Sequence, residues 1–156
     1  MELREIVFRG KKEINGEWVE GSLHIEWGEA TVDGRSIDYR ILGMHGECYY
    51  VDPSTVGQYT GLKDKNGKRI WEGDIVSFSS SDYMSFVHDG AVIFKEGSYS
   101  IEYFKKYFKA PCFHRIGQID MWLDMGASGI IEYEYKVIGN IHDNPELLKG
   151  ENDAAD

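Results

Sequence analysis

The sequence contains few cysteines and prolines and no long apolar run, so disulfide bonds, extended linkers and membrane-spanning helices are not expected. Its two cysteines, Cys48 and Cys112, lie far apart in no paired motif, which argues against a secreted disulfide framework. Three prolines in 156 residues leave little room for an extended linker. No apolar run approaches the length of a membrane-spanning helix, and the charged stretch 1–21 does not resemble a signal peptide. We therefore expect a cytoplasmic protein whose core needs neither a disulfide nor a metal.

Basic charge is also scarce. The 17 lysines and arginines are outnumbered by 27 acidic residues, which gives a net charge of −10. This balance repels polyanions, so we predict that the protein does not bind duplex DNA non-specifically at physiological salt, and we expect no membrane partner. Solubility explains the acidity most simply, although an acidic protein can also occupy the surface of a basic partner.

Glycine and tyrosine are abundant, with 18 and 10 copies, and this favours many short strands and turns. Three dipeptides are typical of hairpin turns: Asn15-Gly16, Asp33-Gly34 and Asn66-Gly67. Residues 52–55 read as a turn with proline in its second position. The predicted fold class is therefore mainly β, built of short antiparallel strands and hairpins. Strands are expected at 4–9, 17–25, 29–32, 36–42, 47–51, 75–78, 90–94, 98–102 and 131–141, with a loop at 79–82.

The central stretch 56–78 has the clearest local pattern. Its Asn66-Gly67 dipeptide predicts a hairpin tip with a type I′ turn and with Gly67 at positive φ. Neighbouring residues in a strand point to opposite faces, yet Ile70-Trp71 and Ile75-Val76 are apolar pairs. We therefore expect these strands to be covered on both faces, by the N-terminal strands, by an aromatic insertion or by a second subunit.

That aromatic insertion, at residues 103–129, is ambiguous. Tyr103, Phe104, Tyr107 and Phe108 have the spacing of one helical face, and Ile116, Ile119 and Trp122 have that of another turn or two. The same aromatic residues would also suit strands. Near the end, Asn144 and Pro145 are suited to begin a short C-terminal helix, and residues 149–156 read as a flexible acidic tail.

The central stretch also carries a resemblance. The string QYTGLKDKNGK at 58–68 and EGDIV at 72–76 resemble the motif of the YopX family, small proteins of bacteriophages and prophages. Shorter matches, REI at 4–6, FRGK at 8–11, VIGNI at 137–141 and NPELL at 144–148, extend the resemblance over nearly the whole chain. It implies a bacterial host and an SH3-like β-barrel component, but no established activity. We expect an N-terminal β region at 1–55 packed on a barrel region at 56–148, followed by the tail.

No motif of catalysis or metal binding stands out. Glu72 and Asp74 are the best carboxylate pair, because their spacing in a strand would place them on one face, although Asp after Gly is an ordinary bend residue. Cys112 and His114 lie two residues apart, which is weak as a metal pair. We therefore predict a protein that is not an enzyme and holds no metal or cofactor.

The candidate interaction surface combines the basic island around the hairpin tip with nearby aromatic residues. Such a surface suits a peptide or single-stranded nucleic acid, and it is also what a soluble hairpin tip with buried aromatics would contain. We predict a protein-interaction module that binds a host or phage protein; the alternative is a nucleic-acid-associated protein or an acidic mimic of a polyanion. The large aromatic content of 103–122 favours a homo-oligomer, most simply a dimer. The candidate residues are Tyr59, Lys63, Lys65, Lys68, Arg69, Trp71, Phe104 and Trp122.

Overall fold

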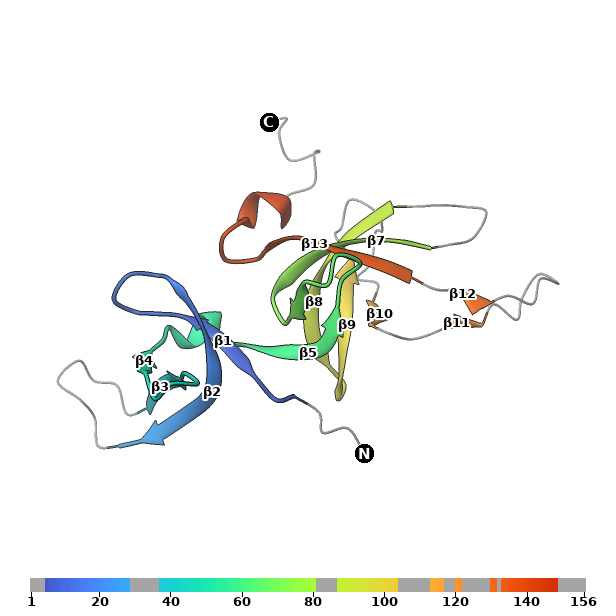
Figure 1. Cartoon of the computed structure of the whole chain (residues 1–156). Helices are drawn as coiled ribbons and strands as arrows, with labels where there is room; N and C mark the ends of the chain where they lie inside the picture. The colour runs from blue at the N-terminus through green and yellow to red at the C-terminus, as the bar shows by residue number, and fades with distance from the viewer. Residues whose placement is uncertain are drawn as a thin grey trace. The chain divides into compact units, whose positions relative to one another are not determined.

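A computed structural model describes residues 5–28, 37–80, 87–103, 113–116, 120–121, 130–131 and 133–148. Strands dominate these residues and the helices are two short 3-10 turns, so the predicted mainly β fold class is confirmed (Figure 1). The chain divides into two compact units, Met1–Gly61 and Leu62–Asp156, where the sequence suggested a boundary at 55/56. None of the helices in the described part is long and apolar enough to span a bilayer.

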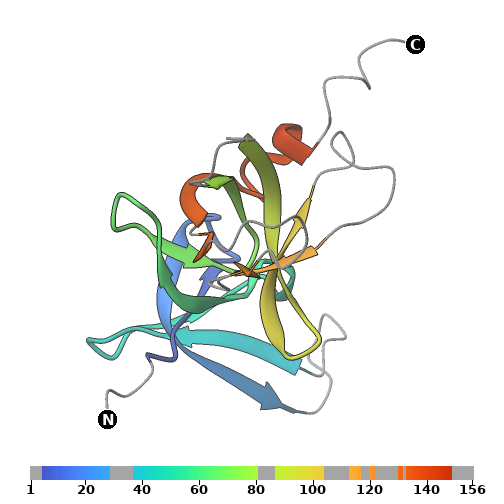
Figure 2. The same ribbon diagram turned by 90° about the vertical axis from the view of Figure 1, so that its right-hand side faces the viewer.

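The first sheet has six strands in the order β4-β3-β2-β1-β5-β6, and the N-terminal unit contributes all of them except β6 and the end of β5. Strands β2 and β3 pair over six residue pairs. Figure 2 shows the two strands side by side. The predicted hairpin at Asn15-Gly16 joins β1 to β2. Across this turn, the N–H of Lys12 donates to the carbonyl of Glu17 at 2.9 Å. The strands are β1 (Phe8–Lys11), β2 (Trp18–Trp27), β3 (Ile37–Leu42), β4 (Cys48–Tyr50) and the first part of β5 (Gly57–Lys63).

The core of the N-terminal unit is small. Ile41 and Val51 are buried beneath Gly10, where an added Cβ would lie 3.1 Å from the Cβ of Val51, so glycine allows the close approach. Val51 pairs with Lys12 in an isolated antiparallel bridge. The chain that leaves β4 therefore runs beside the end of β1. The 3-10 helix η1 (Pro53–Thr55) follows, and the carboxylate of Asp52 caps it by accepting from the N–H of Ser54 at 2.9 Å.

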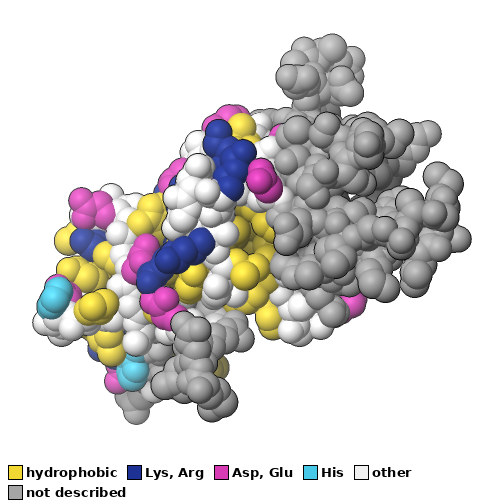
Figure 3. Space-filling view, turned by 45° about the vertical axis from the view of Figure 1, so that its right-hand side comes forward, with side chains coloured by type: hydrophobic (Ala, Val, Ile, Leu, Met, Phe, Trp, Pro, Cys, Tyr) yellow, Lys and Arg dark blue, Asp and Glu magenta, His cyan; other side chains and the backbone are white. Residues whose placement is uncertain are grey.

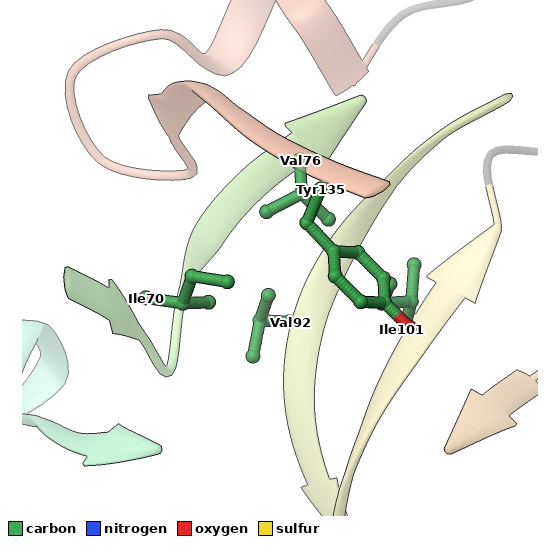
Figure 4. Packing of buried hydrophobic residues seen from close by; sticks show 5 residues of the cluster. All are labelled: Ile70, Val76, Val92, Ile101 and Tyr135. Carbon is green, nitrogen blue, oxygen red and sulfur yellow. The ribbon is translucent and has the colours of Figure 1, made fainter. Parts of the chain in front are cut away.

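The C-terminal unit holds a second antiparallel sheet, in the order β10-β9-β8-β7-β13. Strand β6 packs on one face of it, and Ile70, Val76, Val92, Ile101 and Tyr135 point toward one another there (Figure 4). The strands are β6 (Arg69–Trp71), β7 (Asp74–Ser80), β8 (Val87–Lys95), β9 (Ser98–Tyr103), β10 (Phe113–Arg115) and β13 (Tyr133–Asn140); β11 (Asp120–Met121) pairs only with β12 (Ile130–Ile131) among the described strands.

The predicted cover on both faces of the central strands is confirmed. Ile70, Ile75 and Val76 are fully buried, and Trp71 is 4% exposed. Ile75 packs with Ala91 in a second cluster, against Ile141 and Leu147 of the C-terminal segment. That segment ends in the 3-10 helix η2 (Pro145–Leu148), which stands where a short helix was predicted. The cover over Ile75 thus includes the C-terminal segment of the same chain, which was not among the covers expected from the sequence.

The hairpin at Asn66-Gly67 exists, but its turn is not of type I′. Gly67 has φ +80°, as predicted, and the N–H of Asp64 donates to the carbonyl of Lys68 at 2.7 Å. Glu96 is the one non-glycine residue at positive φ in the described part, so Asn66 does not have the conformation that type I′ requires. The turn with two positive φ values is Glu96-Gly97, between β8 and β9.

Other expectations are corrected or lie outside the described residues. The described strands form no closed barrel, and the SH3-like component is not confirmed. In the insertion, residues 113–115 form strand β10, and residues 120–121, which lie within the predicted helical spacing from Ile116 to Trp122, form strand β11. Ser79 and Ser80 belong to β7 rather than to a loop. The expectations for 29–36, for Phe104 to Phe108, for Ile119 and Trp122 and for the tail fall on residues outside the described ranges.

Candidate interaction site

The structure separates the residues of the predicted interaction surface. Tyr59 and Trp71 are each only 4% exposed, so their rings offer almost no surface to a partner. Lys63, Lys65 and Lys68 are exposed, and Arg69 is half-buried, with its guanidinium 6.0 Å from the centroid of the Trp71 ring. Phe104 and Trp122 lie outside the described residues. The hairpin tip is therefore a solvated basic loop with its nearby aromatics buried.

The loop at this tip is held by the carboxylate of Asp64, which is 6% exposed. One oxygen, Oδ1, accepts from the N–H groups of Asn66 and Lys68 at 2.8 and 2.9 Å. The other, Oδ2, accepts from the N–H of Val137 on β13 at 3.1 Å. Burial raises the pKa of Asp64, but these backbone N–H bonds outweigh burial and leave the pKa below its ordinary value. Asp64 thus joins the tip to the edge of β13.

One member of the proposed carboxylate pair, Asp74, is engaged with the backbone. Asp74 is 1% exposed, and its Oδ2 accepts from the N–H of Trp71 at 2.9 Å, which fixes the bend between β6 and β7. The sequence allowed two interpretations of Asp74, a bend residue or a catalytic carboxylate, and this contact is the one expected of a bend residue. Within the described part of the chain, no three His, Cys, Asp or Glu side chains gather as metal ligands would. The side chains of Cys112 and His114 are outside that part.

Sequence reasoning missed a hollow in the N-terminal unit. It is open, has a volume of about 440 Å³, and lies between β4 and the beginning of the β1–β2 turn. Two of its apolar lining residues are strongly exposed to solvent: Ile14 is 90% exposed and Tyr50 is 51% exposed. Two oppositely charged residues contribute to the rim. The lining residues are Lys12, Glu13, Ile14, Cys48, Tyr49 and Tyr50.

The cations of this unit lie over aromatic rings. The ammonium of Lys12 is 4.4 Å from the centroid of the Tyr49 ring and 3.0 Å from the carboxylate of Glu17. Hydrogen bonds from Lys12 and Asn15 lower the pKa of Glu17, so this acid stays charged beside Lys12. Arg40 stacks on Tyr50 at 5.5 Å and pairs with Glu26. The positive charge near the hollow is thus largely balanced.

A second stacked group lies on the β1–β2 ribbon. The guanidinium of Arg9 is 4.7 Å from the centroid of the Trp18 ring, and the ammonium of Lys11 is 5.4 Å from it. Such contacts are worth roughly 0.5–1 kcal/mol at exposed sites. Among the described residues on the face drawn in Figure 3, Lys and Arg side chains lie near Asp and Glu and form no continuous basic strip.

Comparison with known proteins gives a family and little more. A family model described as YopX protein matches residues 7–149. No curated protein matches the chain. Among solved structures, the crystal structure of protein EF1440 from Enterococcus faecalis is similar, at 23% identity and a TM-score of 0.43, over 93% of this chain and 99% of that one.

Proposed function

This chain belongs to the YopX family, and we propose that it is a non-enzymatic protein-interaction module that binds a partner polypeptide through the hollow of its N-terminal unit. The partner would be a protein of the bacterial host or of the phage. The hollow itself is the observation that supports this proposal. It presents the exposed side chain of Ile14 in an open hollow lined also by Tyr49 and Tyr50, where an apolar anchor residue of a partner would be partly buried.

The charges around the hollow favour a polypeptide over a polyanion. Lys12 is paired with Glu17, and Glu13 adds a negative charge to the lining. A nucleic acid would need uncompensated basic groups along its backbone. An apolar side chain of a protein partner needs only apolar walls and satisfied charges at the rim, which this site offers.

The test compares two substitutions of exposed apolar residues. Ile14→Glu places a charge in the hollow, whereas Met44→Glu changes a residue that is 93% exposed and does not line it. Because both side chains are solvated, neither change should alter stability by more than about 0.5 kcal/mol. Each tagged variant is expressed in infected or lysogenic host cells, and the proteins that co-purify are quantified by mass spectrometry.

We expect a partner that co-purifies with the unmodified chain and with Met44→Glu but is depleted at least tenfold with Ile14→Glu. The proposal is wrong if no protein co-purifies in a fixed ratio, or if its recovery is unaffected by Ile14→Glu.

A nucleic-acid-associated role is the second candidate, and the stacked group of Arg9, Lys11 and Trp18 favours it. Cations beside an aromatic ring can hold the phosphates and bases of a single strand. Binding of a fluorescent single-stranded oligonucleotide would be measured at several salt concentrations. Micromolar binding at physiological salt that is lost in Lys11→Glu would favour this role over the first.

Self-association remains a proposal as well. Intramolecular packing over Ile75 removes one of the two reasons for expecting a dimer, and the aromatic content of residues 103–122 is the other. Light scattering coupled to size exclusion decides it, because a monomer mass at all micromolar concentrations would exclude the dimer.

A further inference from the structure

Strand β4 is paired along its whole length with β3, but on its other side described residues pair only with its C-terminal end. Its register sets Cys48 opposite Leu42 and Tyr50 opposite Arg40 on β3. The N–H of Gly43 donates to the carbonyl of Glu47 at 2.8 Å, and the N–H of Val51 donates to the carbonyl of Tyr39 at 3.0 Å. In an antiparallel ladder, alternate residues direct both backbone groups to the same neighbour. Residues 47, 49 and 51 therefore bond toward β3, and Cys48 and Tyr50 direct their N–H and C=O groups to the opposite side.

On that opposite side, the chain supplies only part of a neighbouring strand. The N–H of Glu13 donates to the carbonyl of Tyr50 at 3.1 Å, and the N–H of Asp52 donates to the carbonyl of Lys11 at 2.9 Å. Continued in this register, Asn15 would face Cys48. The turn prevents this, because the N–H of Gly16 bonds to the carbonyl of Lys12 at 2.8 Å and bends the chain away. No described strand pairs with Cys48 on this side, and the hollow lies where one would.

We infer that the hollow receives an extended peptide segment of the partner, which adds to the edge of β4 at Cys48 as a new strand. This inference rests on the proposed function and specifies how the partner is held. The segment would form two backbone hydrogen bonds with Cys48 and place an apolar side chain against Ile14. Main-chain bonds provide attachment in this mode of recognition, and the side-chain site provides selectivity.

The C-terminal unit offers a contrast that makes the open edge significant. Proteins commonly cover the edges of their sheets, because unpaired N–H and C=O groups recruit other strands. The edge of β13 is covered: its Tyr135 carbonyl accepts from the N–H of Lys65 at 3.0 Å, and its Val137 N–H is bonded to Asp64. At Cys48, by contrast, no described strand covers the edge, and the hollow lies beside it.

Position 48 allows a matched pair of substitutions that isolates the backbone donor. Cys48→Pro removes the N–H that faces the open edge, and it removes no bond to β3, so the strand should tolerate it. Cys48→Ala changes the side chain and keeps the N–H. A phage-displayed library of random linear peptides is panned on the full-length chain, and one enriched peptide is synthesised as the probe. Its affinity for each variant is measured by calorimetry, with circular dichroism to confirm folding.

We expect the peptide to bind Cys48→Ala as it binds the unmodified chain, and to lose at least tenfold in affinity for both Cys48→Pro and Ile14→Glu. If Cys48→Pro does not fold, hydrogen exchange in the unmodified chain replaces it: the peptide should slow exchange of the Cys48 amide, and unchanged exchange would contradict strand addition.

The outcomes separate this inference from the proposed function. Binding that is lost in Ile14→Glu but retained in Cys48→Pro would reject strand addition and keep the hollow as a site for side chains alone. A library that yields no specific peptide would count against both. A dimer that dissociates in Cys48→Pro would assign the edge to a second copy of this chain and overturn the inference.

Discussion

Replacing Asp64 by asparagine tests the role of the hairpin tip in the C-terminal unit. The substitution keeps the size of the side chain and one carbonyl oxygen, which can still accept from the N–H groups of Asn66 and Lys68. Its amide NH₂ would then face the N–H of Val137, where Oδ2 now accepts at 3.1 Å. Two donors would meet, and the N–H of Val137 would lose its partner at the edge of β13.

The magnitude follows from those bonds. A hydrogen bond to a charged group contributes about 1.5–3 kcal/mol, and a buried donor left without a partner costs about 1–3 kcal/mol. These two contributions overlap, because the bond lost and the donor left unpaired are the same bond at Val137. We expect Asp64→Asn to lower the free energy of unfolding by about 2–3 kcal/mol at neutral pH.

This loss should depend on pH. The N–H bonds hold the pKa of Asp64 below its ordinary value of 3.8 in the folded protein, in spite of burial. A group whose pKa is lower in the folded state stabilises that state above its unfolded pKa, and this contribution disappears as the pH falls through the folded value. The difference between the unmodified chain and Asp64→Asn should therefore be largest at neutral pH and should shrink below the ordinary value.

Urea titration at several pH values measures the difference, and hydrogen exchange at the Val137 amide reports on the bond itself. The control is Glu134→Gln, which removes a negative charge from β13 at a residue whose side chain is 67% exposed and 3.9 Å from Lys65. This exposed pair should change stability by less than about 1 kcal/mol. A change below about 0.5 kcal/mol for Asp64→Asn, or a larger one that does not vary with pH, would refute the reasoning.

Three further predictions concern turns, glycine contacts and charge. Gly67→Ala should cost about 1 kcal/mol, because an added Cβ meets nothing within 4 Å and only the positive φ opposes it; Gly90→Ala should cost more in the same denaturation assay, because its Cβ would lie 2.6 Å from the carbonyl oxygen of Glu102. Glu96→Gly should stabilise the protein by up to about 1 kcal/mol, because relief of the left-handed conformation of Glu96 at φ +52°, worth about 1–2 kcal/mol, outweighs the conformational entropy that glycine adds to the unfolded chain, about 0.4–1 kcal/mol; a lower unfolding midpoint would contradict this. Random duplex DNA should not be shifted by the protein in a gel at physiological salt, and a salt-sensitive shift would show that local charge outweighs the net charge of −10.

Local sequence located the central hairpin but not its type of turn. Asn66-Gly67 marks the tip correctly, and Gly67 takes the expected left-handed conformation. The turn type depends on Asp64, whose carboxylate binds the N–H groups of Asn66 and Lys68 and favours a turn in which Asn66 keeps negative φ. That carboxylate is positioned by Val137, which is 73 residues away along the chain, so dipeptide preferences could not have predicted it.

The candidate site was harder to predict for a similar reason. The adjacent apolar residues Ile70 and Trp71 correctly indicated a strand buried on both faces, and this burial removes Trp71 from any interaction surface. The hollow arises where residues 12–14 and 48–50 meet and then diverge, and neither segment contains a recognisable motif. Its nearest signal was the apolar Ile14 directly before the Asn15-Gly16 turn, a place where polar residues are usual.

The small core of the N-terminal unit links stability to binding. Among its described residues, Ile41 and Val51 are the buried aliphatic side chains, and Gly10 and Gly21 contribute backbone rather than apolar volume where they pack. Burial of a side chain such as isoleucine contributes about 1.5–3 kcal/mol. Because the unit buries few such side chains, its stability depends strongly on the hydrogen bonds between its strands. A strand added at β4 would extend those ladders and bury Ile14 and Tyr50 in one step. A ligand that binds only the folded state stabilises it by mass action, so the partner should raise the unfolding temperature of this unit in proportion to the logarithm of its concentration.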